Sequence, residues 1–236
     1  MKKKILLISN NFWPENFRSN DIAILLSSDY DLYVLTGYPT YPHKKVFKKK
    51  IVNDKDITKN NFHIFRIPTF KKSYSKFSTF INYLSFIILS FLIGPFLIKN
   101  KKFDYIICFA SSPIYQSILT IFFSKLKKAK SIVWVQDIWP ETLEDLGYIK
   151  NKYLIKFLKK SIYFLYAKHD FILTQSMEYF HHIKNEFTNT KFLFNPSDNF
   201  NSNSEVPNKI KFSVNYKYVV YSGNIGNAQN FDLLLD

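Results

Sequence analysis

Residues 133–142 read Val-Trp-Val-Gln-Asp-Ile-Trp-Pro-Glu-Thr, and they are the strongest local signal in the chain. It begins with strand-forming residues and then carries two carboxylates, Asp137 and Glu141. An apolar strand without polar alternation is typical of a parallel sheet that helices cover on both faces. Such sheets bind ligands at the carboxyl ends of their strands, where a carboxylate can act as a base. A structural interpretation stays open for Glu141, because an acid in the first turn of a helix also complements the helix dipole.

Further apolar runs extend this pattern in both directions along the chain. The predicted strands are residues 5–9, 32–36, 63–67, 105–109, 131–136, 171–174 and 191–194. The predicted helices are residues 20–28, 77–97, 114–127, 152–168 and 177–187. Strands that alternate with helices indicate an α/β fold with a doubly wound, mostly parallel sheet, here of about seven strands.

The alternation of strands and helices stops near residue 196, and we assign residues 1–196 to one domain. Residues 197–215 are polar and rich in Asn, Ser and Pro, which is typical of a linker. Beyond them, Tyr218–Ser222 predicts a strand that leads into a glycine-containing loop and the start of a helix. About 20 residues cannot form a domain alone. Residues 216–236 are therefore interpreted as the beginning of a second, truncated domain.

The net charge of +15 suggests an anionic partner, such as nucleic acid, an anionic membrane or a phosphorylated ligand. Arg18 and Arg66 are the only arginines among the 33 basic residues. Arginine is the preferred residue for forked recognition of phosphates and bases, so its scarcity argues against a nucleic-acid reader. A basic nucleic-acid-binding module remains a remote alternative.

Cysteine and histidine predict neither a disulfide nor a metal centre. Cys108 is the only cysteine, and no histidine cluster has the spacing of metal ligands. The basic N-terminus precedes an apolar run, Ile5–Ile8, that is too short for a signal peptide. We interpret this run as the first strand of a cytoplasmic protein.

Three loops that follow predicted strands carry candidate binding residues. In the first loop, Arg18 can clamp a phosphate, and Asn20 or Asp21 can cap the next helix. The second loop combines the aromatic rings of Tyr38 and Tyr41 with a basic run at residues 43–50, which is either a phosphate- or headgroup-binding segment or a solvated charge run. The third loop, residues 109–113, has small residues that permit close approach of a ligand. The alternative for the first loop is a capped turn whose aromatic residues pack on the core.

Two predicted helices leave a membrane interpretation open. Residues 77–98 are strongly apolar, about long enough to span a bilayer, and flanked by lysines on both sides. They are interpreted as a spanning helix, as a helix buried in the domain, or as a helix whose apolar face enters one leaflet. Residues 152–168 are amphipathic. They form either a helix with one core face and one solvated face or a helix that lies on the membrane surface.

Four motifs occur in a fixed order along the whole chain. They are residues 11–18 (Asn-Phe-Trp-Pro-Glu-Asn-Phe-Arg), 36–42 (Thr-Gly-Tyr-Pro-Thr-Tyr-Pro), 134–141 (Trp-Val-Gln-Asp-Ile-Trp-Pro-Glu) and 222–229 (Ser-Gly-Asn-Ile-Gly-Asn-Ala-Gln). Together they resemble the retaining GT-B glycosyltransferases of bacterial surface-polysaccharide synthesis, and within them the N-acetyl-fucosamine transferases of O-antigen assembly.

The resemblance implies two Rossmann-like domains that face each other across a cleft, with this chain supplying the N-terminal, acceptor-binding domain of the GT-B fold. It implies that Asp137 and Glu141 are catalytic. The residues implied to bind the acceptor are Glu15, Arg18, Thr36, Gly37, Tyr38, Tyr41, Ser112 and Trp139. The residues implied to approach the donor diphosphate through their backbone amides are Gly223, Asn224 and Gly226.

The implied donor is a UDP-sugar or similar nucleotide sugar. The implied acceptor is a saccharide on a polyprenyl diphosphate, met at the cytoplasmic face of the inner membrane by a peripheral protein. No metal and no other cofactor is expected. The family's two-glutamate donor motif would lie beyond residue 236, so the chain is expected to be inactive alone. It is then either a truncated enzyme or the membrane-associated, acceptor-binding subunit of a two-chain glycosyltransferase.

Overall fold

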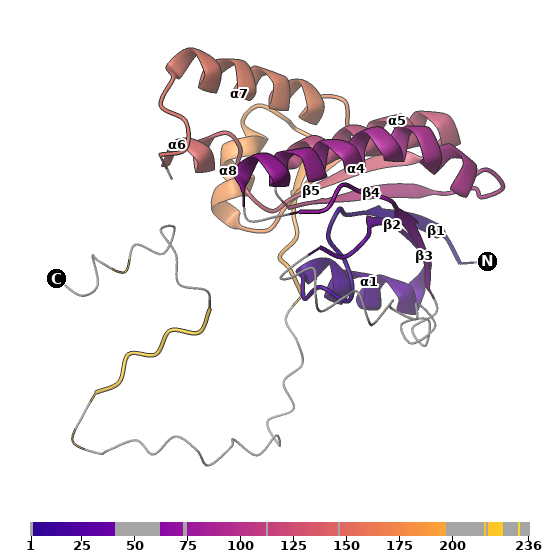
Figure 1. Ribbon diagram of the computed structural model, residues 1–236, viewed down its shortest axis with the longest axis horizontal. Coiled ribbons are helices and arrows are strands. Elements are labelled where there is room, and N and C mark those ends of the chain that lie inside the picture. Colours follow the sequence, from indigo (N-terminus) through magenta and orange to yellow (C-terminus); the bar gives the residue numbers. More distant parts are fainter. Residues whose placement is uncertain are drawn as a thin grey trace.

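The computed structural model describes residues 2–40, 62–72, 75–111, 113–145, 147–196, 215, 217–223 and 231. Within these residues the chain forms a seven-stranded sheet with the order β3-β2-β1-β4-β5-β6-β7 (Figure 1). Every neighbouring pair is parallel. The strands are β1 (Lys4–Ile8), β2 (Asp31–Gly37), β3 (Phe62–Ile67), β4 (Tyr105–Ala110), β5 (Lys130–Val135), β6 (Phe171–Thr174) and β7 (Thr190–Phe192).

Helices cover both faces of this sheet. The helix α1 lies on one face, and α4, α5 and α7 lie on the other (Figure 1). The helices are α1 (Arg18–Asp29), α4 (Lys76–Leu97), the 3-10 helix η2 (Ile114–Ser117), α5 (Ile118–Lys127), α6 (Glu141–Asp145), α7 (Lys152–Tyr166) and α8 (Met177–Lys184). This doubly wound arrangement confirms the α/β fold class predicted from the sequence.

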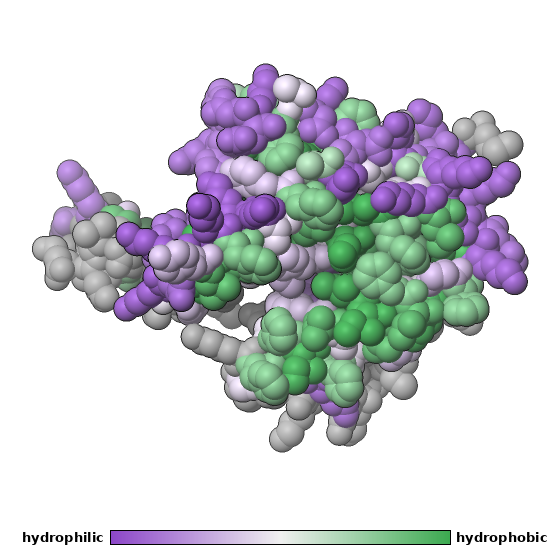
Figure 2. Space-filling model, turned by 90° about the horizontal axis from the view of Figure 1, so that it is seen from above, coloured by the Kyte–Doolittle hydropathy of each residue, from purple (hydrophilic) through white to green (hydrophobic). Residues whose placement is uncertain are grey.

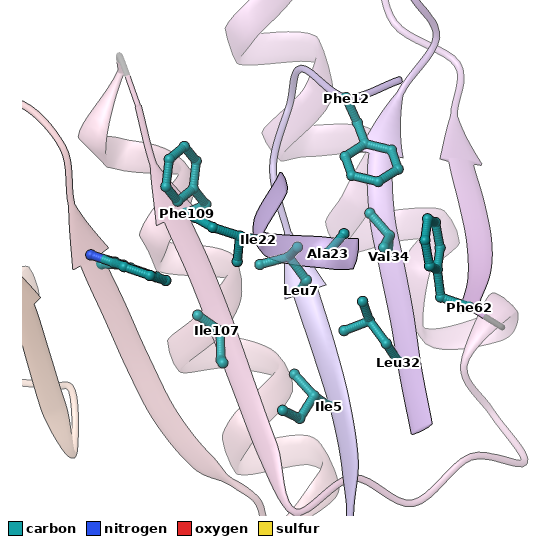
Figure 3. Close-up of a cluster of buried hydrophobic side chains, with 11 residues drawn as sticks. Ile5, Leu7, Phe12, Ile22, Ala23, Leu32, Val34, Phe62, Ile107 and Phe109 are labelled. Carbon is teal, nitrogen blue, oxygen red and sulfur yellow. The ribbon is translucent and has the colours of Figure 1, made fainter. Parts of the chain in front are cut away.

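Alternate residues of the central strands pack on opposite faces, because successive side chains in a strand point to opposite sides. Ile5 and Leu7 of β1 face α1, whereas Leu6 and Ile8 face α4 and α5. Burial on both faces explains why the strand sequences are continuously apolar. On the α1 face, Phe12 lies in the loop after β1 and packs against one end of the hydrophobic cluster (Figure 3).

A third cluster joins β5 and β6 to α7 and α8. Ile162, Leu165 and Tyr166 form the buried side of α7. Two further apolar residues of this predicted amphipathic helix, Leu154 and Phe157, are exposed. The N-terminal half of α7 extends past the sheet, so its apolar positions have no strand beneath them (Figure 1).

Several predicted boundaries differ from the structure. The first helix begins at Arg18, two residues before its predicted start, and residues 114–127 divide into η2 and α5. Residues 217–222 carry no regular secondary structure, although Tyr218–Ser222 was predicted to be a strand. A strand is defined by hydrogen bonds to a neighbouring strand. The linker at 197–214 lies outside the described residues, so the division into domains stays a prediction.

Candidate functional site at the carboxyl edge of the sheet

The strand order places a topological switch point between β1 and β4. The chain runs outward from β1 to β2 and β3, and then returns to the other side of β1 to form β4 to β7. In open parallel sheets, ligands bind in the crevice beyond the carboxyl ends of the strands at this point. The loop after β1 and the loop after β4 therefore frame the candidate site.

Backbone hydrogen bonds tie the ends of β1 and β2 together at this edge. The carbonyl oxygen of Asn10 accepts from the Gly37 amide at 3.1 Å and from Thr36 Oγ1 at 3.2 Å. A β-carbon at Gly37 would lie 3.0 Å from that carbonyl, so the close approach favours glycine. On the other side, the Asn10 amide donates to Gln116 Oε1 at 2.9 Å. Thr36 and Gly37 are thus buried framework residues of the site.

Glu15 and Asn20 hold the loop after β1 in shape. Glu15 is only 3% exposed, and its Oε1 accepts from the Thr40 amide at 2.6 Å. Asn20 Nδ2 donates to the Glu15 carbonyl at 2.7 Å, and Asn20 Oδ1 accepts from the Trp13 amide at 2.9 Å. The prediction that Asn20 or Asp21 caps α1 is wrong, because the helix begins earlier and the Asn20 side chain bonds the preceding loop instead.

The two arginines occupy different places at this edge. Arg18 opens α1, is exposed, and pairs with Asp21 at 3.2 Å between Nη1 and Oδ2. Arg66 comes from β3, and its guanidinium donates to the Gly37 carbonyl at 3.1 Å and to the Trp13 carbonyl at 2.8 Å. Arg66 was not among the predicted site residues, although the rarity of arginine in this chain was an available signal.

Asp137 lies directly beyond β5, next to the switch point. The preceding residue, Gln136, extends the pairing with β4 through a 3.3 Å bond from its amide to the Ala110 carbonyl. Asp137 is partly buried. Burial and the negative charge of Asp137 raise the pKa of Tyr179 in α8. The Tyr179 hydroxyl therefore lies within electrostatic range of the predicted catalytic carboxylate.

Glu141 begins α6 and faces the helical layer. Its Oε1 lies 3.0 Å from Lys159 Nζ in α7 and 3.6 Å from His182 Nε2 in α8. A hydrogen bond to Glu141 raises the pKa of Lys159. Trp139 is partly buried against the third cluster. Glu141 thus joins three helices, and its predicted catalytic role stays a prediction.

An amide cluster that the sequence analysis missed connects the ends of three strands. Asn195 Nδ2 donates to Gln136 Oε1 at 2.7 Å and to Gln175 Oε1 at 2.6 Å. Gln175 Nε2 in turn donates to the Gln136 carbonyl. The signal was an amide residue directly after a strand, a position that Gln136 and Gln175 share.

The remaining predicted site residues are either exposed to solvent or outside the described residues. The Tyr38 side chain is exposed beyond β2. Tyr41, Ser112, Asn224, Gly226 and the basic run at 43–50 lie outside the described residues, and Gly223 is exposed. Among the described residues, no group of three or more His, Cys, Asp and Glu side chains is placed to hold a metal ion.

The sequence matches no protein-family model and no curated protein. In structure, the chain is similar to the crystal structure of HepE from Anabaena in complex with UDP and glucose. The TM-score is 0.50 at 10% identity, over 83% of this chain and 45% of the HepE chain. The chain therefore spans less than half the length of HepE. The likeness agrees with the predicted Rossmann-like N-terminal domain of a GT-B fold.

Proposed function

We propose that this chain is the acceptor-side part of a glycosyltransferase of O-antigen or capsule synthesis. The enzyme would transfer a sugar from a nucleotide sugar to a saccharide on a polyprenyl diphosphate at the cytoplasmic face of the inner membrane. The observation that carries this proposal is the position of Asp137, a partly exposed carboxylate at the switch-point edge of the sheet. The likeness to a fold that holds UDP and glucose supports it.

The exposed side chains at this edge suit a sugar acceptor. The rings of Trp13 and Tyr38 are exposed beyond β1 and β2, and aromatic faces pack well against the apolar faces of sugar rings. Asp137 would accept a hydrogen bond from the acceptor hydroxyl and, as it reacts, its proton. Arg18 is the exposed cation that would face the diphosphate of the acceptor.

The donor half of the reaction would belong to a second domain. Residues 216–236 are its proposed beginning, with Gly223, Asn224 and Gly226 offering backbone amides to the donor diphosphate. Residues 1–196 would then supply the acceptor side of the reaction. A two-chain enzyme, in which a separate protein supplies the donor domain, fits the same observations.

The decisive experiment is Asp137→Asn in an enzyme completed with a donor domain. Removal of a general base lowers kcat by about 10²–10⁴-fold, with little change in acceptor affinity. Glu144→Gln, an exposed neighbour in α6, is the matched control because it makes the same charge change away from the edge. Unchanged turnover in Asp137→Asn would refute the role of this carboxylate.

A further inference from the structure

The helix α4 is built into the core along one side. Phe86 and Ile98 are fully buried against the sheet and α5. A β-carbon at Gly94 would lie 2.5 Å from Phe123 Cζ, so the two helices approach closely there. By length and composition α4 could span a bilayer. Spanning would pull this packed face away from the sheet and expose the second core cluster, so α4 stays with the domain.

The opposite side of α4 is an apolar stripe that is exposed among the described residues. Only 28% of its most apolar 18-residue window is buried. The stripe residues recur every three or four positions and are between 43% and 77% exposed: Phe77, Phe80, Leu84, Ile88, Leu92 and Phe96. Figure 2 looks onto the helical layer that contains α4 and shows a broad hydrophobic area with hydrophilic residues around it. Contiguous apolar area of this kind marks a contact surface.

The charges around the stripe point to an anionic lipid surface. Lys71 precedes α4, and Lys99 and Lys102 follow it, all three exposed. The first and last turns of α4 contain no acidic residue. An apolar face with lysines at its ends suits insertion among acyl chains below anionic headgroups. A second copy of this chain is a poor occupant, because each copy carries a net charge of +15 and the two would repel.

The inner side of α4 also contacts the candidate site. Asn82 Oδ1 accepts from Asn10 Nδ2, in the loop after β1, at 3.3 Å. Asn82 Nδ2 donates to the Phe70 carbonyl at 2.6 Å, and the Phe70 amide donates to Ser85 Oγ at 3.0 Å. These bonds join the N-terminal half of α4 to the loops after β1 and β3. A surface that holds α4 therefore also holds the carboxyl edge of the sheet nearby.

We propose that the α4 stripe docks this domain on an anionic bilayer, with α4 lying in the plane of the membrane and the candidate site at headgroup level. The inference rests on the membrane association in the proposed function, and it names the surface responsible. A diphosphate carried by a lipid would then meet the site without leaving the membrane surface.

Vesicle co-sedimentation of the chain tests this surface. The vesicles are phosphatidylcholine alone and phosphatidylcholine with about one third phosphatidylglycerol. Ile88→Ser/Leu92→Ser should weaken binding to the anionic vesicles by about tenfold or more, because two inserting side chains are lost. The matched control is Ile24→Ser/Leu25→Ser, an exposed apolar pair on α1 at the other face of the sheet. This control should bind like the unaltered chain, and circular dichroism checks that both variants fold.

Several outcomes would overturn the proposal. Equal binding by the α4 variant, or equal losses in both variants, would exclude the stripe as the docking surface. Sedimentation that shows a dimer broken only by the α4 variant would assign the stripe to a second copy. Retention of the chain by membranes in alkaline carbonate would indicate spanning. Turnover on a short-chain acceptor in water, with a donor domain added, tests the proposed function separately, because it needs no bilayer.

Discussion

The tripeptide Trp-Pro-Glu occurs twice at the carboxyl edge, at residues 13–15 after β1 and at residues 139–141 after β5. The Trp–Pro peptide bond is cis in both. Glu15 is buried and accepts from a backbone amide of the neighbouring loop. Glu141 turns toward α7 and α8 and pairs with lysine. The same three residues thus shape the loop beside the candidate site after β1 and join helices after β5.

The difference shows that the surroundings of a glutamate decide what it contributes. The hydrogen bond of Glu15 forms where water is largely absent, so nothing replaces it when it is lost. Water screens the Glu141–Lys159 pair from the lysine side, because the Lys159 side chain is 43% exposed, while both carboxylate oxygens of Glu141 are buried. Mutations at the two motifs should therefore lower the free energy of unfolding by different amounts.

The largest effect is expected for Glu15→Ala. It leaves the Thr40 amide without its acceptor and removes a charge-assisted hydrogen bond, which lowers the free energy of unfolding by about 2–3 kcal/mol. Urea unfolding followed by circular dichroism measures the loss. Glu15→Gln is the control, since it keeps the accepting oxygen and should lose less. An equal loss in both variants would show that the hydrogen bond is not the cause.

A smaller loss, about 1–2 kcal/mol, is expected for Asn20→Ala. This change removes both bonds of the Asn20 amide, to the Trp13 amide and to the Glu15 carbonyl. Asn20→Asp keeps the acceptor for Trp13 and loses only the donor, so it should fall between Asn20→Ala and the unaltered chain. A stability of Asn20→Ala within error of the unaltered chain would contradict this account of the loop.

A double-mutant cycle of Glu141→Gln and Lys159→Met should give a coupling free energy of about 0.2–1 kcal/mol. The pair lies between α6 and α7, where the exposed Lys159 side chain brings water close to it. The coupling comes from urea unfolding of the four proteins. A coupling as large as the loss in Glu15→Ala would remove the contrast between the two motifs.

The smallest effect is a pH dependence at Glu141. The hydrogen bond that Lys159 donates to Glu141 raises the pKa of Lys159 above its ordinary 10.5. The stabilisation is therefore complete below pH 10.5 and is lost as the pH rises through the raised value. The difference in stability between the unaltered chain and Glu141→Gln should shrink by about 0.3 kcal/mol over this range. A difference that grows with pH would contradict the ion pair.

Much of the fold was predictable because it depends on local pattern. The continuous apolar runs located all seven described strands to within a residue or two, and Asp137 at the end of β5 followed from the strand alone. Three features of the candidate site were not predicted: the Arg66 bonds, the Asn20 bonds and the amide cluster at Asn195. The Arg66 bonds and the amide cluster join segments that only the fold brings together, whereas the Asn20 bonds depend on the detailed shape of one short loop.

The two Trp-Pro-Glu motifs separate what each level decides. The residues alone indicated that both motifs follow buried strands and lie at one edge of a parallel sheet, because strand period and turn residues are properties of neighbouring positions. The folded chain was needed to show that Glu15 accepts from the Thr40 amide, that Glu141 pairs with Lys159, and that α4 buries one face while exposing the other. These contacts depend on which residues, distant in sequence, come together in the fold, and a local sequence pattern does not contain that information.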